Sequence, residues 1–578
     1  MNSKITYPFC SIVAWSRWLL VTVLLVAKCY LFDTLVASPE ALNWSPASIL
    51  SKIAAAIFLT LPICISAKRW PIFALLGMTD IWMIIQLIYF RANHLFITWH
   101  MLTVAGNMEG FWSSLIPYCD ASLLLFPALT CLAALCYLWQ SKRHNKWEIL
   151  IICLLGFGLS LTGSIARWYN HREYLNGEPL SWEWMNPCSL PQAFSVDISE
   201  KERMATNYIR YRSIYAYPLF MANDAIRTAI NHRTPEDLSE EEMEELKKLI
   251  NPILPATIPQ GNLVILLLES FESWLLDASD SNGSPICPEM KAYIDHHPIL
   301  YVKDVTTQIQ YGMSGDGQMI VNTGMYPLSE GIACVDYGDN TYPNIAHFYP
   351  QSAIVNPCRN VWNQTMVATS YGYKQLVEPQ SEYRFEWNDS VVIDKMIEII
   401  YTLSAPSCVM GITVSGHIPF DSSPDDIALP DTIPALFRHY MQTAHFTDRQ
   451  IGRLLAWADT AQIMQNSVIA ITGDHRIFHA WLNDEVRDYG LRTNLPFGTG
   501  QAGCPLIIKA PQIDSAIVIE NGRQIDIFST ILALIGQENY FWKGMGCNLL
   551  QDSLSDEENY YVRRQLSDKL IRLNYFKQ

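Results

Sequence analysis

Apolar residues are concentrated in the first third of the chain, where they form five stretches of near-spanning length. The stretches lie at about 18–35, 49–67, 70–90, 121–138 and 147–166. Roughly 20 apolar residues are enough for a helix to cross the hydrocarbon core of a bilayer. The pattern predicts an N-terminal bundle of about five transmembrane α-helices within residues 1–168.

Basic residues predict the orientation of this bundle. Lys4 and Arg17 precede the first stretch, and basic groups at 68–69 and 142–146 separate the second from the third and the fourth from the fifth. Because short loops rich in Lys and Arg stay in the cytoplasm, the N-terminus is predicted to be inside. An odd number of spans then puts everything after Trp168 outside. No small-residue cleavage site follows the first stretch, so we expect a retained anchor rather than a signal peptide.

Three ionisable residues lie within or near the apolar stretches: Lys28, Asp33 and Asp80. Such residues raise the hypothesis of a function inside the membrane. Snorkelling of these side chains toward the membrane surface, or a pair between Lys28 and Asp33, is the simpler explanation. With so few charges and no pair of interrupted helices, transport is the weaker hypothesis for this part.

Beyond the bundle the pattern changes twice. Residues 169–258 are more polar and predict an extracytoplasmic juxtamembrane linker, with a helix that starts at Thr234 and Pro235 and ends near Ile250. From residue 259 onward, short runs that are apolar at nearly every position alternate with helical patterns. The strand-like runs lie at 263–268, 353–355, 409–414, 467–472 and 505–509, and the helical patterns at 391–403, 434–461 and 525–535. Residues 259–578 are therefore predicted to form an extracytoplasmic α/β domain with a largely parallel central sheet, covered on both faces.

The net charge and the cysteine pattern argue against two kinds of binding site. The formal net charge is −16, and no block of Lys and Arg offsets it, which argues against a nucleic-acid partner. The 14 cysteines include no CxxC pair, so no cysteine zinc site is expected. Cysteines after residue 168 would permit disulfides in an oxidising compartment.

Acidic and imidazole side chains follow the ends of the strand-like runs. Glu269 ends one run, His417 follows another, and Asp474 and His475 follow a third. In open α/β sheets, ligands gather beyond the carboxyl ends of the strands. Two carboxylates and an imidazole suit Zn²⁺ or Mn²⁺ better than Ca²⁺. We therefore expect a divalent metal near Glu269, Asp474 and His475.

Ser314 is the candidate nucleophile. It stands between glycines and is followed by Asp316, which is expected to orient the loop. A free serine is a weak nucleophile at neutral pH, whereas metal coordination would let it attack as an alkoxide. A plain turn is the alternative explanation for a serine in this context. His479, four residues after His475, is better explained as a solvated or core histidine than as a further ligand.

As an ordered set, five motifs resemble those of the lipoteichoic acid synthase-like proteins of the sulfatase and alkaline phosphatase superfamily. The motifs are Leu-Glu-Ser-Phe at 268–271, Gly-Met-Ser-Gly-Asp at 312–316, Ser-Gly-His-Ile-Pro-Phe at 415–420, Thr-Gly-Asp-His at 472–475, and Ile-Asp-Ile-Phe at 525–528 with Gly-Cys-Asn-Leu-Leu at 546–550. The resemblance covers about residues 262–550. It implies that Glu269, Ser314, Asp474 and His475 bind one divalent metal, typically Mn²⁺ with Zn²⁺ or Mg²⁺ as alternatives. It also implies that Ser314 carries a covalent phospho-intermediate and that His417 contacts the substrate phosphate.

The chain departs from the resembled family at the substrate groove. Trp362 and Asn363 resemble the Trp-Asn pair of that groove, but Gln364 stands where an arginine usually follows. Arg359 or Arg384 would have to replace that arginine's bidentate contact with a phosphate group. The nucleophile is usually threonine in a Gly-Lys-Thr-Ser-Asp context. These differences leave the transferred group open.

The resemblance and the residues together predict an enzyme of the bacterial cytoplasmic membrane with its catalytic domain on the periplasmic side. It would move a phosphoglycerol-type or phosphoethanolamine group from a membrane phospholipid donor to a glycolipid, glycan or lipid acceptor. A sulfuric-ester or phosphodiester hydrolase is the first alternative, although Ser314 lacks the Cys/Ser-x-Pro-x-Arg context that formylglycine formation needs. A non-catalytic membrane sensor or scaffold is the second, and retention of all four candidate ligands argues against it.

Overall fold

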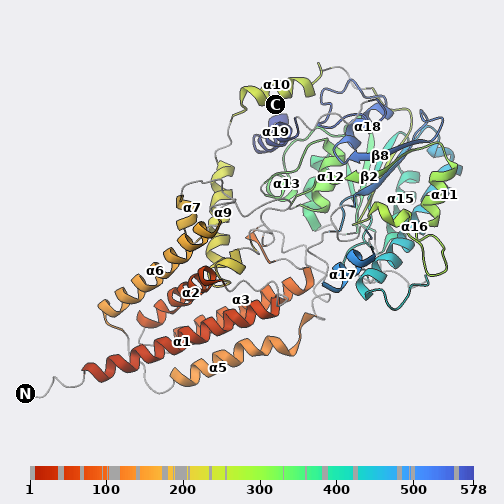
Figure 1. The fold of residues 1–578 in the computed structure, drawn as a ribbon. Helices are drawn as coiled ribbons and strands as arrows, with labels where there is room; N and C mark the ends of the chain where they lie inside the picture. Colours follow the sequence, from red (N-terminus) through yellow and green to blue (C-terminus); the bar gives the residue numbers. More distant parts are fainter. Residues whose placement is uncertain are drawn as a thin grey trace, which may run out of the picture. The chain divides into compact units, whose positions relative to one another are not determined.

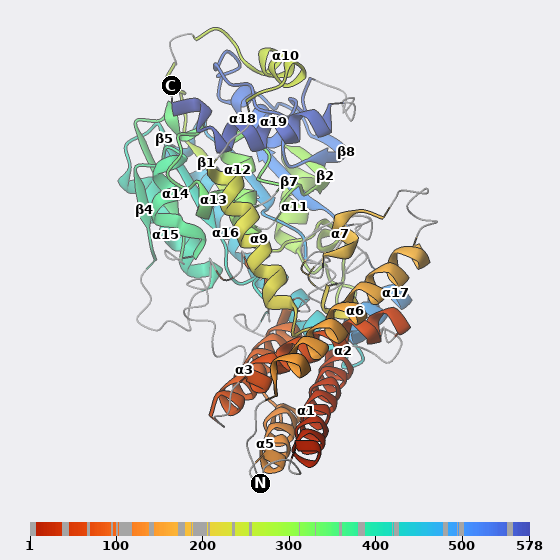
Figure 2. The same ribbon diagram turned by 90° about the vertical axis from the view of Figure 1, so that its left-hand side faces the viewer.

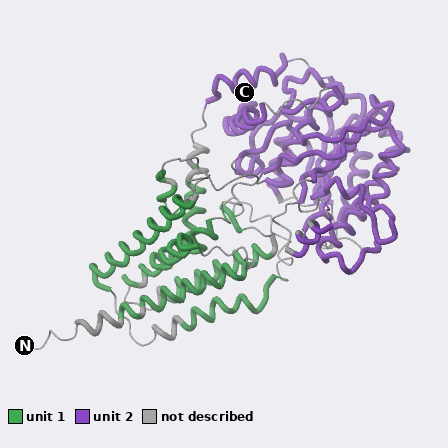
Figure 3. The backbone as a smooth tube through the Cα atoms, viewed as in Figure 1, with its two compact units in different colours: residues 1–102, 111–230 green, residues 103–110, 231–578 purple. Residues whose placement is uncertain are grey.

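The structure is a computed structural model of the 578-residue chain. It describes residues 7–36, 45–65, 70–93, 96–99, 118–137, 144–171, 180–186, 208–233, 237–253, 257–310, 312–329, 331–357, 361–379, 388–418, 427–477, 484–493, 502–551 and 559–577, and the single residues 102, 188, 205, 420 and 495. The chain folds into two compact units (Figure 3), one of residues 1–102 with 111–230 and one of residues 103–110 with 231–578. The predicted division at 168 and 258 remains a prediction.

The first unit is helical (Figures 1 and 2). Its elements are α1 (Tyr7–Val36), α2 (Pro46–Ile65), α3 (Trp70–Asn93), α5 (Leu125–Tyr137), α6 (Lys146–His171), the short α7 (Trp182–Met185) and α9 (Tyr217–Arg233). Every predicted apolar stretch is thus helical over most of its length. Among the described residues, three segments are long and apolar enough to cross a membrane: Ala14–Val36, Phe73–Arg91 and Lys146–Asn170. The apolar helices Pro46–Pro62 and Ala121–Leu132 are shorter.

Buried ion pairs connect the helices of this unit. Lys28 of α1 pairs with Asp80 of α3 at 2.5 Å, and Lys52 of α2 pairs with Asp33 of α1 at 2.5 Å. The expected pair between Lys28 and Asp33 is wrong. Residues five apart on a helix point to different faces, whereas neighbours three or four apart meet, so each side chain found its partner on another helix.

In the second unit, the described residues form one eight-stranded sheet in the order β4-β3-β5-β1-β6-β7-β2-β8. The strands are β1 (Leu263–Leu268), β2 (Leu300–Thr306), β3 (Gln351–Val355), β4 (Gln375–Val377), β5 (Ser407–Ile412), β6 (Val468–Gly473), β7 (Cys504–Lys509) and β8 (Ile517–Arg523). All pairs are parallel except those of β7, which runs antiparallel to β6 and β2. The predicted sheet is confirmed as mostly parallel.

Helices cover both faces of this sheet. Along β1, alternate residues from Leu263 to Leu267 join a core with α12 (Ser314–Thr323), α18 (Asp526–Leu534) and α19 (Tyr560–Arg572). The intervening residues, Val264 to Leu268, join a second core with α11 (Pro288–His296), α15 (Asp389–Thr402) and α16 (Ala435–Thr460). Because both faces are covered, β1 is buried at every position, which explains its uninterrupted apolar run.

The helix before the sheet starts later than the sequence suggested. Helix α10 spans Glu240–Leu249, and Ser239 caps it: the Ser239 hydroxyl accepts from Glu242 N, and the Glu242 carboxylate accepts from Ser239 N. This reciprocal capping box satisfies two backbone donors that a helix start leaves unpaired. Thr234, the predicted first cap, lies outside the described residues.

Candidate active site

The strand order brings the candidate ligands together. β1 lies between β5 and β6, and Leu268 at the end of β1 pairs with Gly473 at the end of β6. Glu269 therefore leaves the sheet beside Asp474 and His475. Ser314 reaches the same place from the first residue of α12.

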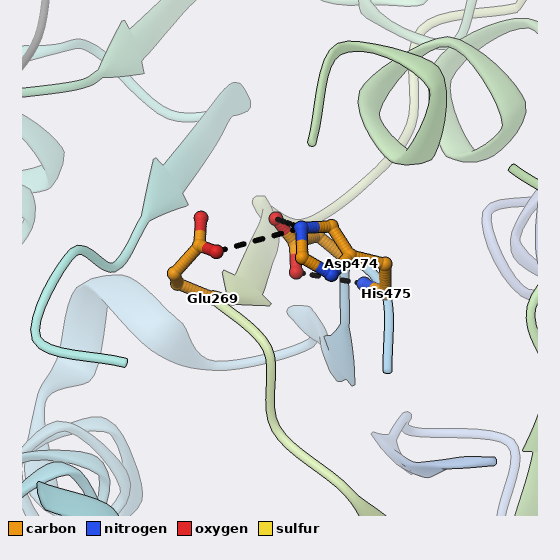
Figure 4. Close-up of side chains that lie close together, drawn as sticks. All are labelled: Glu269, Asp474 and His475. Carbon is orange, nitrogen blue, oxygen red and sulfur yellow. Dashed lines mark hydrogen bonds and ion pairs between the residues drawn. The ribbon is translucent and has the colours of Figure 1, made fainter. Parts of the chain in front are cut away.

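The distances define a compact group (Figure 4). His475 Nε2 lies 3.4 Å from Glu269 Oε1 and 3.8 Å from Asp474 Oδ2. One ligand atom from each of these three residues lies within 4.8 Å of the others. The Ser314 hydroxyl donates to Glu269 Oε2 at 3.1 Å and lies 3.3 Å from His475 Nε2. All four predicted ligands thus meet, while their chemical roles remain predictions.

Hydrogen bonds orient the ligand atoms toward this centre. His475 Nδ1 donates to the Arg476 carbonyl at 3.0 Å, which orients Nε2 toward the centre. Asp474 Oδ1 accepts from the backbone N–H groups of Ser270 at 3.0 Å and His475 at 2.7 Å. Its other oxygen, Oδ2, is buried and accepts no hydrogen bond. A buried carboxylate oxygen without a donor is costly, so a cation is the natural partner for it.

The electrostatics agree with a cation site. Burial and the neighbouring charge of Glu269 raise the pKa of Asp474 to about 7. Burial opposes ionisation of Glu269, but the charges of His475 and His417 hold its pKa below the ordinary value. Burial also disfavours charged His475, yet Asp474 and Glu269 raise its pKa. Two buried carboxylates and one imidazole fit a divalent metal that takes mixed oxygen and nitrogen ligands.

Close approaches of the backbone fix the serine. Met313 has φ +44°, and Asp316 Oδ2 accepts from Gln310 N at 2.7 Å and Gly312 N at 3.0 Å, which holds the loop before α12. A Cβ on Gly317 would lie 2.5 Å from the Asp474 carbonyl oxygen. Glycine at this position is therefore what lets α12 approach the end of β6.

His417 stands on a loop that a buried aspartate holds. Its ring is exposed, its Nδ1 donates to the Ile418 carbonyl at 2.7 Å, and its charge acts on Glu269. Asp389, fully buried, accepts from Val414 N at 2.8 Å and Ser415 N at 2.9 Å through Oδ1. Sequence reasoning missed Asp389. The sequence shows Asp389 just before a predicted helix, but acidic residues are common at the start of helices because they interact favourably with the helix dipole.

The predicted groove residues have different surroundings. Trp362 lies beside the serine loop, since a Cβ on Gly315 would be 3.5 Å from its Cβ and Cγ. Asn363 Nδ2 donates to the Cys334 carbonyl at 2.9 Å. Gln364 is fully buried, and its Nε2 donates to Gln318 Oε1 at 2.9 Å. Arg359, Arg384 and His479 lie outside the described residues.

Comparisons with known proteins agree with these features. Residues 262–537 match the sulfatase family. Lipoteichoic acid synthase 1 of Bacillus subtilis is 23% identical over 385 residues, which cover 61% of this chain and 58% of that protein. The lipoteichoic acid synthase of Staphylococcus saprophyticus is 21% identical over 503 residues, 82% of this chain and 73% of that protein. In fold, the chain is similar to the integral membrane lipooligosaccharide phosphoethanolamine transferase A of Neisseria meningitidis, with a TM-score of 0.56 at 12% identity over 92% of this chain and 96% of that one.

Residues 262–537 thus match the sulfatase family, and the first unit of the chain contains candidate membrane helices. The chain is distantly similar to the lipoteichoic acid synthases, which confirms the resemblance that the motifs predicted. The chain spans 58% and 56% of the length of the two Bacillus subtilis relatives.

Proposed function

We propose that this protein is a membrane-anchored, metal-dependent transferase. It moves a phosphoglycerol-type or phosphoethanolamine group from a phospholipid to a glycan or lipid acceptor, through a phosphoserine at Ser314. The observation that carries the proposal is the placement of the Ser314 hydroxyl 3.1 Å from Glu269 and 3.3 Å from His475, beside Asp474, whose Oδ2 accepts no hydrogen bond. Similarity to proteins named lipoteichoic acid synthase supports a lipid donor and a glycolipid acceptor.

The proposed setting is the bacterial cytoplasmic membrane. In this proposal α2 and α5 also cross the membrane, which gives five spans together with the three longer candidates. The N-terminus is then inside, and residues 259–578 lie on the periplasmic side of the membrane. Anchoring keeps a catalytic domain and two lipidic substrates on one surface, which raises their effective concentration.

Glu269, Asp474, His475 and Ser314 would hold one divalent metal, with Mn²⁺ the first choice and Zn²⁺ or Mg²⁺ to be compared. When bound, such an ion lowers the pKa of a ligating hydroxyl and offsets the charge that develops on a transferring phosphate. The N-terminus of α12, where Ser314 stands, adds the positive end of the helix dipole.

The proposed reaction consists of two nucleophilic displacements at phosphorus. Ser314 Oγ attacks phosphorus, its proton passes to Glu269, and the bond from phosphorus to the diacylglycerol oxygen breaks while His417 protonates that oxygen. In the second half, the acceptor hydroxyl attacks the phosphoserine and gives its proton to His417. The Oγ–phosphorus bond breaks, and Ser314 regains its proton from Glu269. Water in place of the acceptor would give hydrolysis.

The test uses the purified full chain with mixed phospholipids and Mn²⁺, Zn²⁺ or Mg²⁺. Mass spectrometry of the peptide that contains Ser314 is expected to show the added phospho-group, with diacylglycerol released. Ser314→Ala should abolish both, whereas Ser314→Thr, which keeps a hydroxyl, should retain part of the activity. Undiminished transfer by Ser314→Ala would contradict the proposal, and formylglycine at residue 314 would favour a sulfatase instead.

A further inference from the structure

Two arginines are buried in the helical unit. Arg167, near the end of α6, and Arg212, in the segment before α9, are each only 2% exposed. Arginine is almost never fully buried unless it is paired. These two side chains therefore need an explanation that the candidate active site does not give.

The partners of Arg167 are neutral. Its Nη2 donates to Ser51 Oγ at 3.0 Å and to the Tyr211 carbonyl at 2.8 Å. Its Nη1 is buried without an acceptor. A guanidinium is thus anchored in place with one N–H edge unused.

Arg212 has the same kind of surroundings. Its Nη1 donates to Ser164 Oγ at 2.6 Å, and its Nη2 makes longer bonds to the carbonyls of Trp184 at 3.2 Å and Asn186 at 3.4 Å. Its Nε is buried without an acceptor. Both longer bonds go to α7 and the residue that follows it, a helix of only four residues.

The surroundings of Arg167 and Arg212 differ from those of two buried lysines in the same unit. Lys28 and Lys52, the buried lysines of the same unit, each have an aspartate at 2.5 Å. No carboxylate among the described residues pairs with Arg167 or Arg212. Within the described part of the chain, these two positive charges therefore have no carboxylate partner, and an anion would satisfy both the charges and the unused N–H groups.

The position in the helices points to the source of that anion. Arg167 lies three residues before the end of the candidate span Lys146–Asn170, and Ser51 lies in the second turn of α2. In the proposed orientation this is the outward end of the bundle, where Lys and Arg are normally scarce. Ionisable residues at such a depth are costly and are retained for function.

We infer that Arg167 and Arg212 bind the phosphate of a membrane phospholipid. The planar N–H forks of two arginines match phosphate oxygens, and two positive charges favour a headgroup with net negative charge, such as phosphatidylglycerol. The phosphate replaces the two long bonds from Arg212 to the carbonyls of Trp184 and Asn186. Arg167 and Arg212 belong to the unit of residues 1–102 and 111–230, and Ser314 belongs to the other unit, so this binding does not depend on whether Ser314 transfers a group.

The test measures lipid retention by native mass spectrometry of the full chain in an uncharged detergent with EDTA. Long-chain phosphatidylglycerol is titrated against the matched diacylglycerol, which lacks the phosphate, and against inorganic phosphate. Saturable binding of phosphatidylglycerol, absent for the diacylglycerol, is expected. The pair Arg167→Gln and Arg212→Gln should weaken it by about tenfold or more, as expected for lost charge-assisted hydrogen bonds.

Arg91→Gln is the matched control, because Arg91 of α3 belongs to the same unit and pairs with Asp120 at 3.2 Å. Its lipid affinity should equal that of the wild type. Unchanged affinity in the double arginine variant would overturn the site, and displacement of the lipid by equimolar inorganic phosphate would overturn the assignment to a lipid. If the double variant does not fold, equal retention of the diacylglycerol and phosphatidylglycerol by the wild type would still overturn the inference. EDTA keeps a divalent ion out of the candidate active site, so inactive Ser314 chemistry leaves this result unaffected.

Discussion

The two units each contain a buried cluster with unbalanced charge, and the two clusters have opposite signs. Glu269 and Asp474 are two buried carboxylates beside the single buried imidazole of His475, and Asp474 Oδ2 has no hydrogen-bond donor. Arg167 and Arg212 have no carboxylate partner among the residues that the structure describes, and each has a buried N–H without an acceptor. Burial alone therefore does not predict a ligand. The uncompensated charge does, and its sign states whether the ligand is a cation or an anion.

The clusters also differ in what holds them. Backbone groups at the ends of β1 and β6 fix Glu269 and Asp474, and the strands beneath them are buried on both faces. Side-chain hydroxyls and the carbonyls around the short helix α7 hold Arg167 and Arg212. A rigid cluster suits a small ion with strict geometry, whereas an adaptable one suits a bulky headgroup.

The largest expected effect comes from Asp474→Asn. Asparagine keeps an oxygen for the two backbone donors but replaces Oδ2, which has no hydrogen-bond donor, by an amide nitrogen that cannot ligate a cation. We expect transfer to fall by roughly 10³-fold and the stabilisation by Mn²⁺ in thermal unfolding to vanish, since a bound ligand stabilises only while it binds. Asp277→Asn, at an exposed acid of the same unit, is the control.

The same variant tests whether the two clusters bind their ligands independently. Asp474→Asn should keep the affinity for phosphatidylglycerol, and the double arginine variant should keep the stabilisation by Mn²⁺. Loss of both ligands in either variant would show that the clusters are not independent. Retained Mn²⁺ stabilisation in Asp474→Asn would exclude this aspartate as a ligand.

A compensated pair supplies the contrasting case. Lys52→Met leaves Asp33 buried without its partner at 2.5 Å, so the free energy of unfolding should fall by about 3–5 kcal/mol. Lys52→Met combined with Asp33→Leu removes both charges and should recover most of that loss. Denaturant unfolding of the full chain in detergent measures both, and a double variant as unstable as the single one would refute this reasoning.

The sequence predicted the parts of the fold whose residues share one environment. β1, β5, β6 and β7 are almost wholly buried, so their apolar runs stood out. β2 and β8 have exposed positions along much of their length, and no apolar run marked them. The antiparallel direction of β7 depends on how the chain returns to the sheet, which local patterns do not encode.

The contacts of the candidate site likewise include some that the sequence predicted and some that it could not predict. Glu269, Asp474 and His475 were predictable because each directly follows a strand, and parallel strands release their ends at one edge. The hydrogen bond between Gln364 and Gln318 was not predictable, because it depends on how α14 (Gln364–Ser370) packs against α12. The neutral partners of Arg167 and Arg212 were equally invisible, since they come from four separate segments.

An intermediate effect is expected for Asp389→Ala. The change leaves the N–H groups of Val414 and Ser415 and the Thr447 hydroxyl without their buried acceptor, and these hold the loop that carries His417. We expect kcat to fall about 10- to 100-fold with little change in metal affinity, because misplacing a proton donor slows the chemical step. Asp389→Asn, which keeps one oxygen, should recover part of the rate. Asp394→Ala, at an exposed acid of the same helix, should have no effect.

The last prediction concerns the pH dependence of stability, which changes gradually with each pH unit. Glu272 is buried and accepts from Trp274 Nε1 at 2.6 Å and Ile477 N at 3.1 Å, and burial raises its pKa from 4.5 to about 8. Between these two values the folded chain keeps a proton that the unfolded chain has lost. The free energy of unfolding contributed by Glu272 therefore falls as pH rises, by at most about 1.4 kcal/mol per pH unit.

Glu272→Gln tests this contribution because it removes the titration while keeping the size of the side chain. Glutamine cannot accept both hydrogen bonds, so the variant should be less stable than the wild type at pH 5. That gap should narrow as the pH rises to 8.5, because only the wild type then incurs the cost of a buried charge. Thermal unfolding in EDTA measures the gap, with Glu398→Gln, at an exposed glutamate on α15, as the control. A gap that stays constant with pH would mean that Glu272 titrates alike in the folded and unfolded chains.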